Sequence, residues 1–196
     1  MKAFNFAQLA VGTALGLASP AAAQMTGGGY KGVEFVEAVR KSDGDKAMEL
    51  LTSSAPGIVD SKADDGNTAL IVALMRRDEE WTGFLLNKGA DPNLAGKGGD
   101  TPLIVASRIG FDQAVEWLLS MGAKADTSNR MGETPLIVAV QARQTPVVKL
   151  LLNAGADPDR TDTAAGYSAR DYAQRDPRAR DIQQLIQAKK PKPAGK

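Results

Sequence analysis

Thr101-Pro102-Leu103-Ile104-Val105-Ala106 decides the fold, because near-copies of this stretch recur along the chain at a fixed spacing. The copies are Thr68-Ala69-Leu70-Ile71-Val72-Ala73, Thr134-Pro135-Leu136-Ile137-Val138-Ala139 and a diverged Ser168-Ala169-Arg170-Asp171-Tyr172-Ala173. Their first residues lie 33 residues apart twice and then 34 apart. A second marker, Gly-Ala followed by Asp or Lys, keeps the same spacing at Gly89, Gly122 and Gly155. Two markers in one register indicate an array of one repeated supersecondary unit.

Each unit is predicted to contain two helices. Thr101 suits a helix N-cap, and Pro102 suits the first helical position, where its fixed φ and missing N–H cost nothing. Gly110 is expected to end this short helix, and a second helix follows from about Asp112. Gly122 lies just past the end of the second helix, where glycine tolerates a left-handed backbone. Each unit is therefore predicted to run helix, turn, helix, extended loop.

The number of units follows from a second constant interval. An alanine in the first helix and the second residue of a late apolar pair are always 13 residues apart: Ala38 and Leu51, Ala73 and Leu86, Ala106 and Leu119, Ala139 and Leu152, Ala173 and Ile186. The predicted repeats span about 32–62, 63–95, 96–128, 129–161 and 162–188. No unit can bury its apolar stripe alone, so the fold is predicted to be an all-α solenoid of about five stacked units.

Over roughly residues 32–188, the chain resembles the ankyrin repeat. The features that carry the resemblance are the motif Thr-Pro-Leu-x-x-Ala, the late leucine pair, Gly-Ala-Asp and the 33-residue period. The resemblance implies a module that binds protein partners. The family's histidine after Thr-Pro-Leu, which ties the loop to the helix, is replaced by Ile71, Ile104 and Ile137. We therefore expect an apolar substitute for that tie. Arg170 replaces a buried leucine in the last unit, which fits an end cap whose outer face meets water.

The N-terminal residues 1–23 are predicted to be a secretory signal. Lys2 precedes an apolar run, and Ala21-Ala22-Ala23 supplies a cleavage site after Ala23. A membrane anchor is disfavoured because Gly12, Gly16 and Pro20 shorten the run below the roughly 20 residues that a spanning helix needs. We expect an exported, periplasmic bacterial protein, with a flexible lead-in over residues 24–31 and a disordered basic tail over residues 189–196.

Charge and composition argue against several functions. Cleavage removes one lysine, which leaves 23 cationic against 23 acidic residues, so we expect neither nucleic-acid binding nor stable membrane anchoring. The sequence has no cysteine and no histidine, and no phosphate-binding loop is found, so no cofactor, metal site or enzymatic activity is expected. A small metal-dependent enzyme or regulatory domain remains an alternative, through carboxylates at Asp64, Asp65, Asp91, Asp126, Asp157, Asp159 and Asp162.

We therefore expect a monomeric, non-enzymatic adaptor that binds a folded protein partner. The ankyrin resemblance implies contacts at the loop tips and on the exposed side of the first helices. The residues expected there are Asp65, Asn67, Met75, Arg76, Lys97, Asp100, Arg108, Ile109, Arg130, Met131, Glu133, Gln141 and Tyr167. Trp81 and Trp117 are expected in the core. A secreted effector or an immunity-type inhibitor that uses the same surface is a further alternative.

Overall fold

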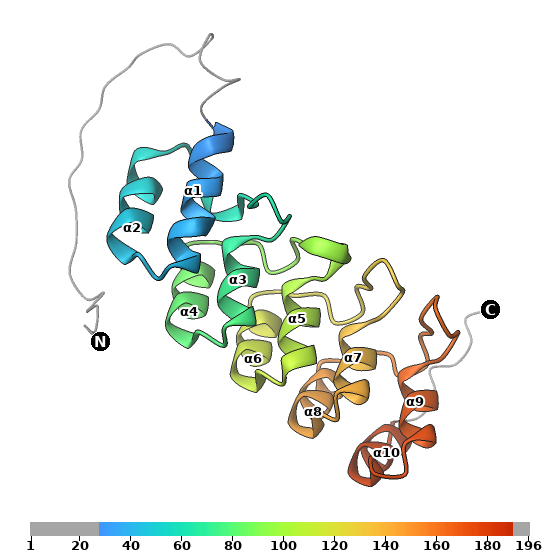
Figure 1. Cartoon of the computed structure of the whole chain (residues 1–196). Coiled ribbons are helices and arrows are strands. Elements are labelled where there is room, and N and C mark those ends of the chain that lie inside the picture. The colour runs from blue at the N-terminus through green and yellow to red at the C-terminus, as the bar shows by residue number, and fades with distance from the viewer. Residues whose placement is uncertain (1–27, 190–196) are drawn as a thin grey trace.

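The chain folds as five pairs of short helices stacked side by side (Figure 1). The structure is a computed structural model that describes residues 28–189. Its α-helices are α1 (Gly28–Arg40), α2 (Gly44–Ser53), α3 (Ala69–Met75), α4 (Glu79–Asn87), α5 (Pro102–Ile109), α6 (Asp112–Ser120), α7 (Pro135–Gln141), α8 (Thr145–Asn153), α9 (Ala169–Arg175) and α10 (Arg180–Gln187). Two 3₁₀ turns, η1 (Ile58–Asp60) and η2 (Lys97–Gly99), lie in the loops. The predicted all-α array of five units is confirmed.

The repeated threonines start the first helices as expected. The side chains of Thr68, Thr101 and Thr134 each accept a hydrogen bond from the backbone N–H three residues later, at 3.2 to 3.3 Å. Ser168 does the same for α9 and forms a full capping box with Asp171. Each cap satisfies a backbone donor that the helix itself leaves unpaired. The diverged fourth copy of the motif therefore keeps the helix-starting function of the others.

The turn between the two helices of a unit has a left-handed residue in four units. Gly110 fills this place with φ of 68°, as the sequence predicts. The equivalent residues Ser42, Arg77 and Arg143 are not glycines, yet their φ values are 57°, 54° and 55°. A non-glycine residue is disfavoured in this region, so compensating contacts are expected. Arg77 has such contacts, described below.

The helices form two layers. The odd-numbered helices pack in one row and the even-numbered helices in a second row, and hairpin-like loops project beyond the odd-numbered row (Figure 1). Ala73, Ala106 and Ala139 are fully or almost fully buried in the first row, where their small size lets neighbouring helices approach. The core between the layers contains large apolar side chains from every unit: Phe35, Leu70, Ile71, Leu74, Leu85, Leu103, Ile104, Leu118, Leu136, Ile137, Leu151 and Ile182.

The isoleucines at the family's histidine position are buried, and Ile71 makes an apolar contact with a loop. Ile71, Ile104 and Ile137 are buried at the base of the loops. A Cβ atom built on Gly96 would lie 2.6 Å from Cδ1 of Ile71, so the loop of the next unit rests directly on this side chain. At Ile71, the contact between helix and loop is thus made by packing.

The ends differ from expectation at one place. Helix α1 begins at Gly28, so residues 28–31, which were expected to be part of a flexible lead-in, are helical. The predicted signal and cleavage site, the rest of the lead-in and residues 190–196 lie outside the described residues. Within residues 28–189, no helix has both the length and the apolar character needed to cross a bilayer.

Candidate functional site

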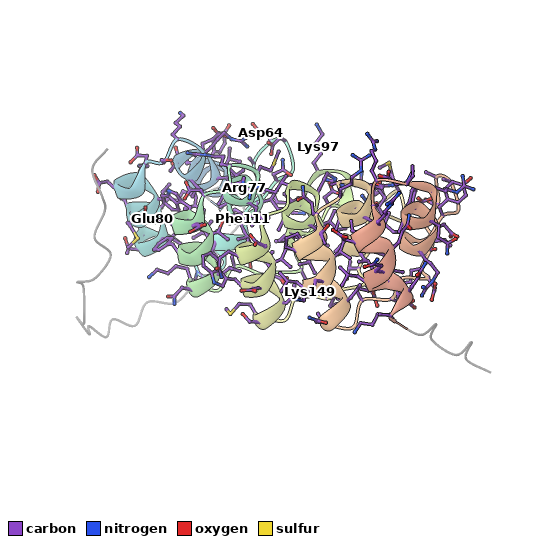
Figure 2. All side chains as sticks on the ribbon, turned by 90° about the horizontal axis from the view of Figure 1, so that it is seen from below. Asp64, Arg77, Glu80, Lys97, Phe111 and Lys149 are labelled. Carbon is purple, nitrogen blue, oxygen red and sulfur yellow. The ribbon has the colours of Figure 1, made fainter. Side chains whose placement is uncertain are left out.

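The loops form a continuous edge along the stack. Each of the second, third and fourth loops is closed like a hairpin by a backbone hydrogen bond across its base: Ala63 N to Asn67 O, Gly96 N to Asp100 O, and Asn129 N to Glu133 O, at 2.9 to 3.0 Å. Figure 2 shows Asp64 and Lys97 at the same edge, on neighbouring tips, and Lys149 on the opposite side of the molecule.

Neighbouring hairpins are bonded to one another through their backbones. The N–H of Arg130 donates to the carbonyl of Gly98 at 3.1 Å, and the N–H of Thr163 donates to that of Met131 at 2.9 Å. The Asn67 side chain accepts from the Lys97 N–H at 3.1 Å. These bonds fix the relative positions of the tips, so side chains from different units are presented together.

A network of charged side chains lies beneath the third and fourth tips. Arg108 donates to both carboxylate oxygens of Asp100, at 2.5 and 3.2 Å, and its Nη2 lies 3.6 Å from Oε2 of Glu133. Asn129 donates to Asp100 and to Glu133, at 2.8 Å each. Burial alone raises the pKa of Asp100, but the hydrogen bonds from Arg108 and Asn129 outweigh this effect, so the pKa lies below its ordinary value. The pKa of Arg108 is raised, chiefly by its hydrogen bond to Asp100.

This network forms the floor of a hollow with a volume of about 420 Å³. The hollow is lined by Gly98, Asp100, Arg108, Asn129, Arg130, Met131 and Glu133. Five of these residues are among those expected from the sequence, namely Asp100, Arg108, Arg130, Met131 and Glu133. The structure therefore brings the expected residues of two units together around one depression.

Three side chains at or beside the hollow remain available to a partner: Met131 and Arg130 line it, and Lys97 directly precedes the lining residue Gly98. Met131 is 51% exposed, although it is apolar. Lys97 and Arg130 are exposed, and within residues 28–189 no carboxylate lies within ion-pair distance of either side chain. We call Lys97, Asp100, Arg108, Arg130, Met131 and Glu133 the tip surface.

The expected residues of the second unit have mixed environments. Met75 is 59% exposed. Asp65 pairs with Arg40 at 2.8 Å, and its pKa is lowered, first by the backbone N–H of Asn67. Asn67 itself is buried and holds the next hairpin. Arg76 donates to the carbonyls of Val39 and Arg40 and to Ser42, so its guanidinium is engaged within the fold.

The remaining expected residues flank the tip surface. Ile109 is half-buried against the core, and Gln141 is exposed. Tyr167 was expected to be exposed but is half-buried. Its ring meets that of Tyr172 edge to face at 5.6 Å, and the Arg175 guanidinium lies 3.8 Å from its centroid. Tyr167 is therefore held within the last unit.

A second hollow, of about 220 Å³, was not expected from the sequence. It lies between α4 and α6, on the row opposite to the hairpins, and is lined by Gly83, Leu86, Asn87, Trp117, Ser120 and Met121. Trp81 is buried as expected, whereas Trp117 is only partly buried because Gly83 offers no side chain to cover it. The signal in the sequence is this mid-helix glycine, at a place where other units carry Glu116 and Lys149.

The loop carboxylates considered as an alternative site take part in turns. Asp91 and Asp157 accept hydrogen bonds from the N–H groups two residues on, at 2.8 and 3.0 Å. Asp126 accepts from the N–H of Asp157 in the following unit, at 2.9 Å. In the part of the chain that the structure describes, no group of three or more carboxylates is arranged to hold a metal ion.

Comparison with known proteins places the fold in a family. A family model described as ankyrin repeats (3 copies) matches residues 35–129 and 84–162, which together span all of the second, third and fourth units. No curated protein matches the sequence. The matched span covers most of the described helices and includes the tip surface, so the chain belongs to the ankyrin-repeat family.

Proposed function

We propose that this chain is a non-enzymatic adaptor of the bacterial periplasm, and that it binds a folded protein partner through the tip surface. Ankyrin repeats are generally protein–protein interaction modules and are typically not enzymes. The observation that carries the proposal is the hollow between the third and fourth hairpins, with the exposed Met131 at its edge. An apolar anchor beside charged groups on a pre-formed surface is typical of the energetic centre of an interface.

The rigidity of this surface supports a folded partner. The tips are joined by backbone hydrogen bonds, and the floor of the hollow is a completed network. Little side-chain freedom remains to be lost at the floor on binding, which favours affinity.

Affinity capture from a periplasmic extract tests the binding surface. Met131→Asp places a charge where an apolar contact is proposed, so we expect it to remove the partner from the captured material. Lys149→Glu changes an exposed residue on the opposite side and should leave capture intact. Arg108 is left unchanged, because its loss would leave Asp100 and Glu133 uncompensated. If Met131→Asp captures the same proteins as the unmodified chain, the partner binds elsewhere.

Cell fractionation tests the location. We expect the protein in the periplasmic fraction with Gln24 as its first residue. A cytoplasmic protein that retains residues 1–23 would contradict this part of the proposal.

A further inference from the structure

Three equivalent tip positions carry charges of different sign. Asp64, Lys97 and Arg130 are separated by 33 residues each and lie on consecutive hairpins. All three are exposed. The equivalent residue of the last unit is Thr163. The tips therefore present one acidic group followed by two neighbouring basic groups along the stack.

The two basic groups are held next to each other by the backbone. The Arg130 N–H donates a hydrogen bond to the Gly98 carbonyl. In addition, the lack of a side chain at Gly99 lets Arg130 approach the third hairpin closely. A Cβ atom on Gly99 would lie 3.1 Å from the nitrogen and 3.2 Å from Cγ of Arg130. The stem of Arg130 thus rests on the third hairpin, which carries Lys97 at its tip.

The two carboxylates that line the same hollow are engaged by neighbouring side chains. Asp100 is bonded to Arg108 and Asn129, and Glu133 is bonded to Asn129 and lies near Arg108. The floor holds one arginine, Arg108, against two carboxylates, Asp100 and Glu133, so its net charge is −1, and Lys97 and Arg130 bring the charge of the whole tip surface to +1. The surface is complementary to an anionic group with an apolar neighbour.

We propose that the third and fourth hairpins bind an acidic segment of the partner protein, with its carboxylates on Lys97 and Arg130 and an apolar side chain on Met131. This inference rests on the proposed function. Packed helices lie roughly 8–10 Å apart, which sets the spacing of successive tips. In a polyproline II conformation, which has three residues per turn and a rise of about 3.1 Å, residues i and i+3 lie on the same side and about 9 Å apart. Two carboxylates separated by two residues therefore match the two tips.

A protein segment fits this surface better than a nucleic acid. Asp64 on the preceding tip would repel a continued chain of phosphates. The sequence as a whole is almost neutral, with a formal net charge of +1, and lacks the basic excess on which nucleic-acid binding depends.

Synthetic peptides test the proposal on the full chain. The probe is acetyl-Gly-Glu-Ala-Leu-Glu-Ala-Gly-amide, and its control has glutamine in place of both glutamates. Binding is followed by NMR, through the Met131 methyl group and the backbone amides of Lys97 and Arg130. The double variant Lys97→Glu/Arg130→Glu removes the basic pair, and Lys124→Glu/Lys149→Glu makes the same change of charge at exposed residues elsewhere.

The acidic peptide should shift these resonances saturably, and more weakly as salt is raised. The glutamine peptide and the Lys97→Glu/Arg130→Glu protein should each weaken binding about tenfold, whereas the control variant should not. Equal binding of both peptides, no saturable binding, or equal competition by a short single-stranded DNA overturns the inference. If the peptide fails but Met131→Asp still abolishes capture of the partner, the proposed function stands without it. If capture is also unaffected, both fail.

Discussion

At the scale of single residues, Thr82 is out of place in an apolar layer. Its side chain is completely buried, and Oγ1 has no hydrogen-bond partner. The equivalent residues of the other units are Ala47, Val115, Val148 and Ile182. A buried hydroxyl without a partner retains the cost of losing its hydration.

Thr82→Val should therefore stabilise the protein, because it keeps the shape of the side chain and removes the unpaired hydroxyl. We expect the free energy of unfolding in urea to rise by about 1 kcal/mol. The same exchange at Thr101 removes an N-cap and should lower the free energy of unfolding by about 1 kcal/mol. A loss of stability in both variants would show that the Thr82 hydroxyl has a bonding function.

Asp162 makes the free energy of unfolding depend on pH. It is buried, and burial alone would raise its pKa. Hydrogen bonds from the Tyr172 hydroxyl, at 2.6 Å, and from the N–H groups of Ala165 and Gly166 outweigh burial, so the pKa lies below its ordinary value. The folded protein then binds fewer protons than the unfolded chain. This contribution is fully present above the unfolded pKa and is lost as the pH falls through the folded pKa.

Asp162→Asn should be less stable than the unmodified protein at pH 7, and the difference should narrow as the pH falls below about 4. Urea unfolding at pH 7, 5 and 3 measures this dependence. Asp181→Asn, at an exposed position in α10, serves as the control. A difference that is the same at all three pH values would mean that Asp162 acts through shape alone.

At the scale of elements, the hairpins depend on glycines that allow close contact. Gly132 has φ of +76°, and a Cβ atom there would lie 2.6 Å from the backbone nitrogen of Thr163 in the next hairpin. Gly122 also has a positive φ, of +88°, but has open space around it. The two positions share the conformational requirement and differ in the contact.

Gly132→Ala should cost more stability than Gly122→Ala. The second variant should lose about 1 kcal/mol from the unfavourable φ alone, and the first roughly 1–2 kcal/mol more, because the backbone of the next hairpin must move. Thermal unfolding of the two variants gives the comparison. Equal losses would imply that the hairpins separate easily, which would also weaken the case for a rigid tip surface.

The starts and ends of helices could be predicted because they depend on neighbours in sequence. Thr101 caps the helix that follows it, and Gly110 ends that helix. Arg77 could not be understood in this way. Its guanidinium donates to the carbonyls of Ile109 and Gly110 at 2.6 and 3.1 Å and lies over Phe111, all in the next unit (Figure 2). Such partners are defined only once the units have stacked.

The same reason limits the prediction of the site. The repeat register placed Asp100, Arg108 and Met131 on loop tips and an exposed helix face, and the structure brings them to one hollow. The register did not predict that the side chains of Asn67 and Arg76 would form hydrogen bonds within the fold, to the backbone of Lys97 and of Arg40. The register does show that Gly83 stands where other units carry Glu116 and Lys149, but the hollow beside Trp117 is defined only once α4 and α6 have packed together.

At the scale of the whole molecule, contacts between neighbouring units hold the stack together. Arg76 reaches back to the end of α1, and Arg77 reaches forward to the end of α5. Cations at the C-terminal ends of helices are favourable because they meet free carbonyls and the negative end of the helix dipole. At the far end, Arg170 pairs with Asp159 and donates to the carbonyl of Ile186. Arg170, which stands where the family has a buried leucine, thus closes the stack with polar bonds.

The last unit should therefore stabilise the units before it. Removing residues 162–196 deletes α9 and α10 and exposes apolar surface of α7 and α8, against which they pack. In a linear array, the loss includes the interface as well as the unit itself. We expect a lower urea midpoint and a smaller m-value, measured by circular dichroism, since less surface is exposed on unfolding. Removing only residues 190–196 is the control. An unchanged midpoint in the longer truncation would mean that the fifth unit is an appendage, not a cap.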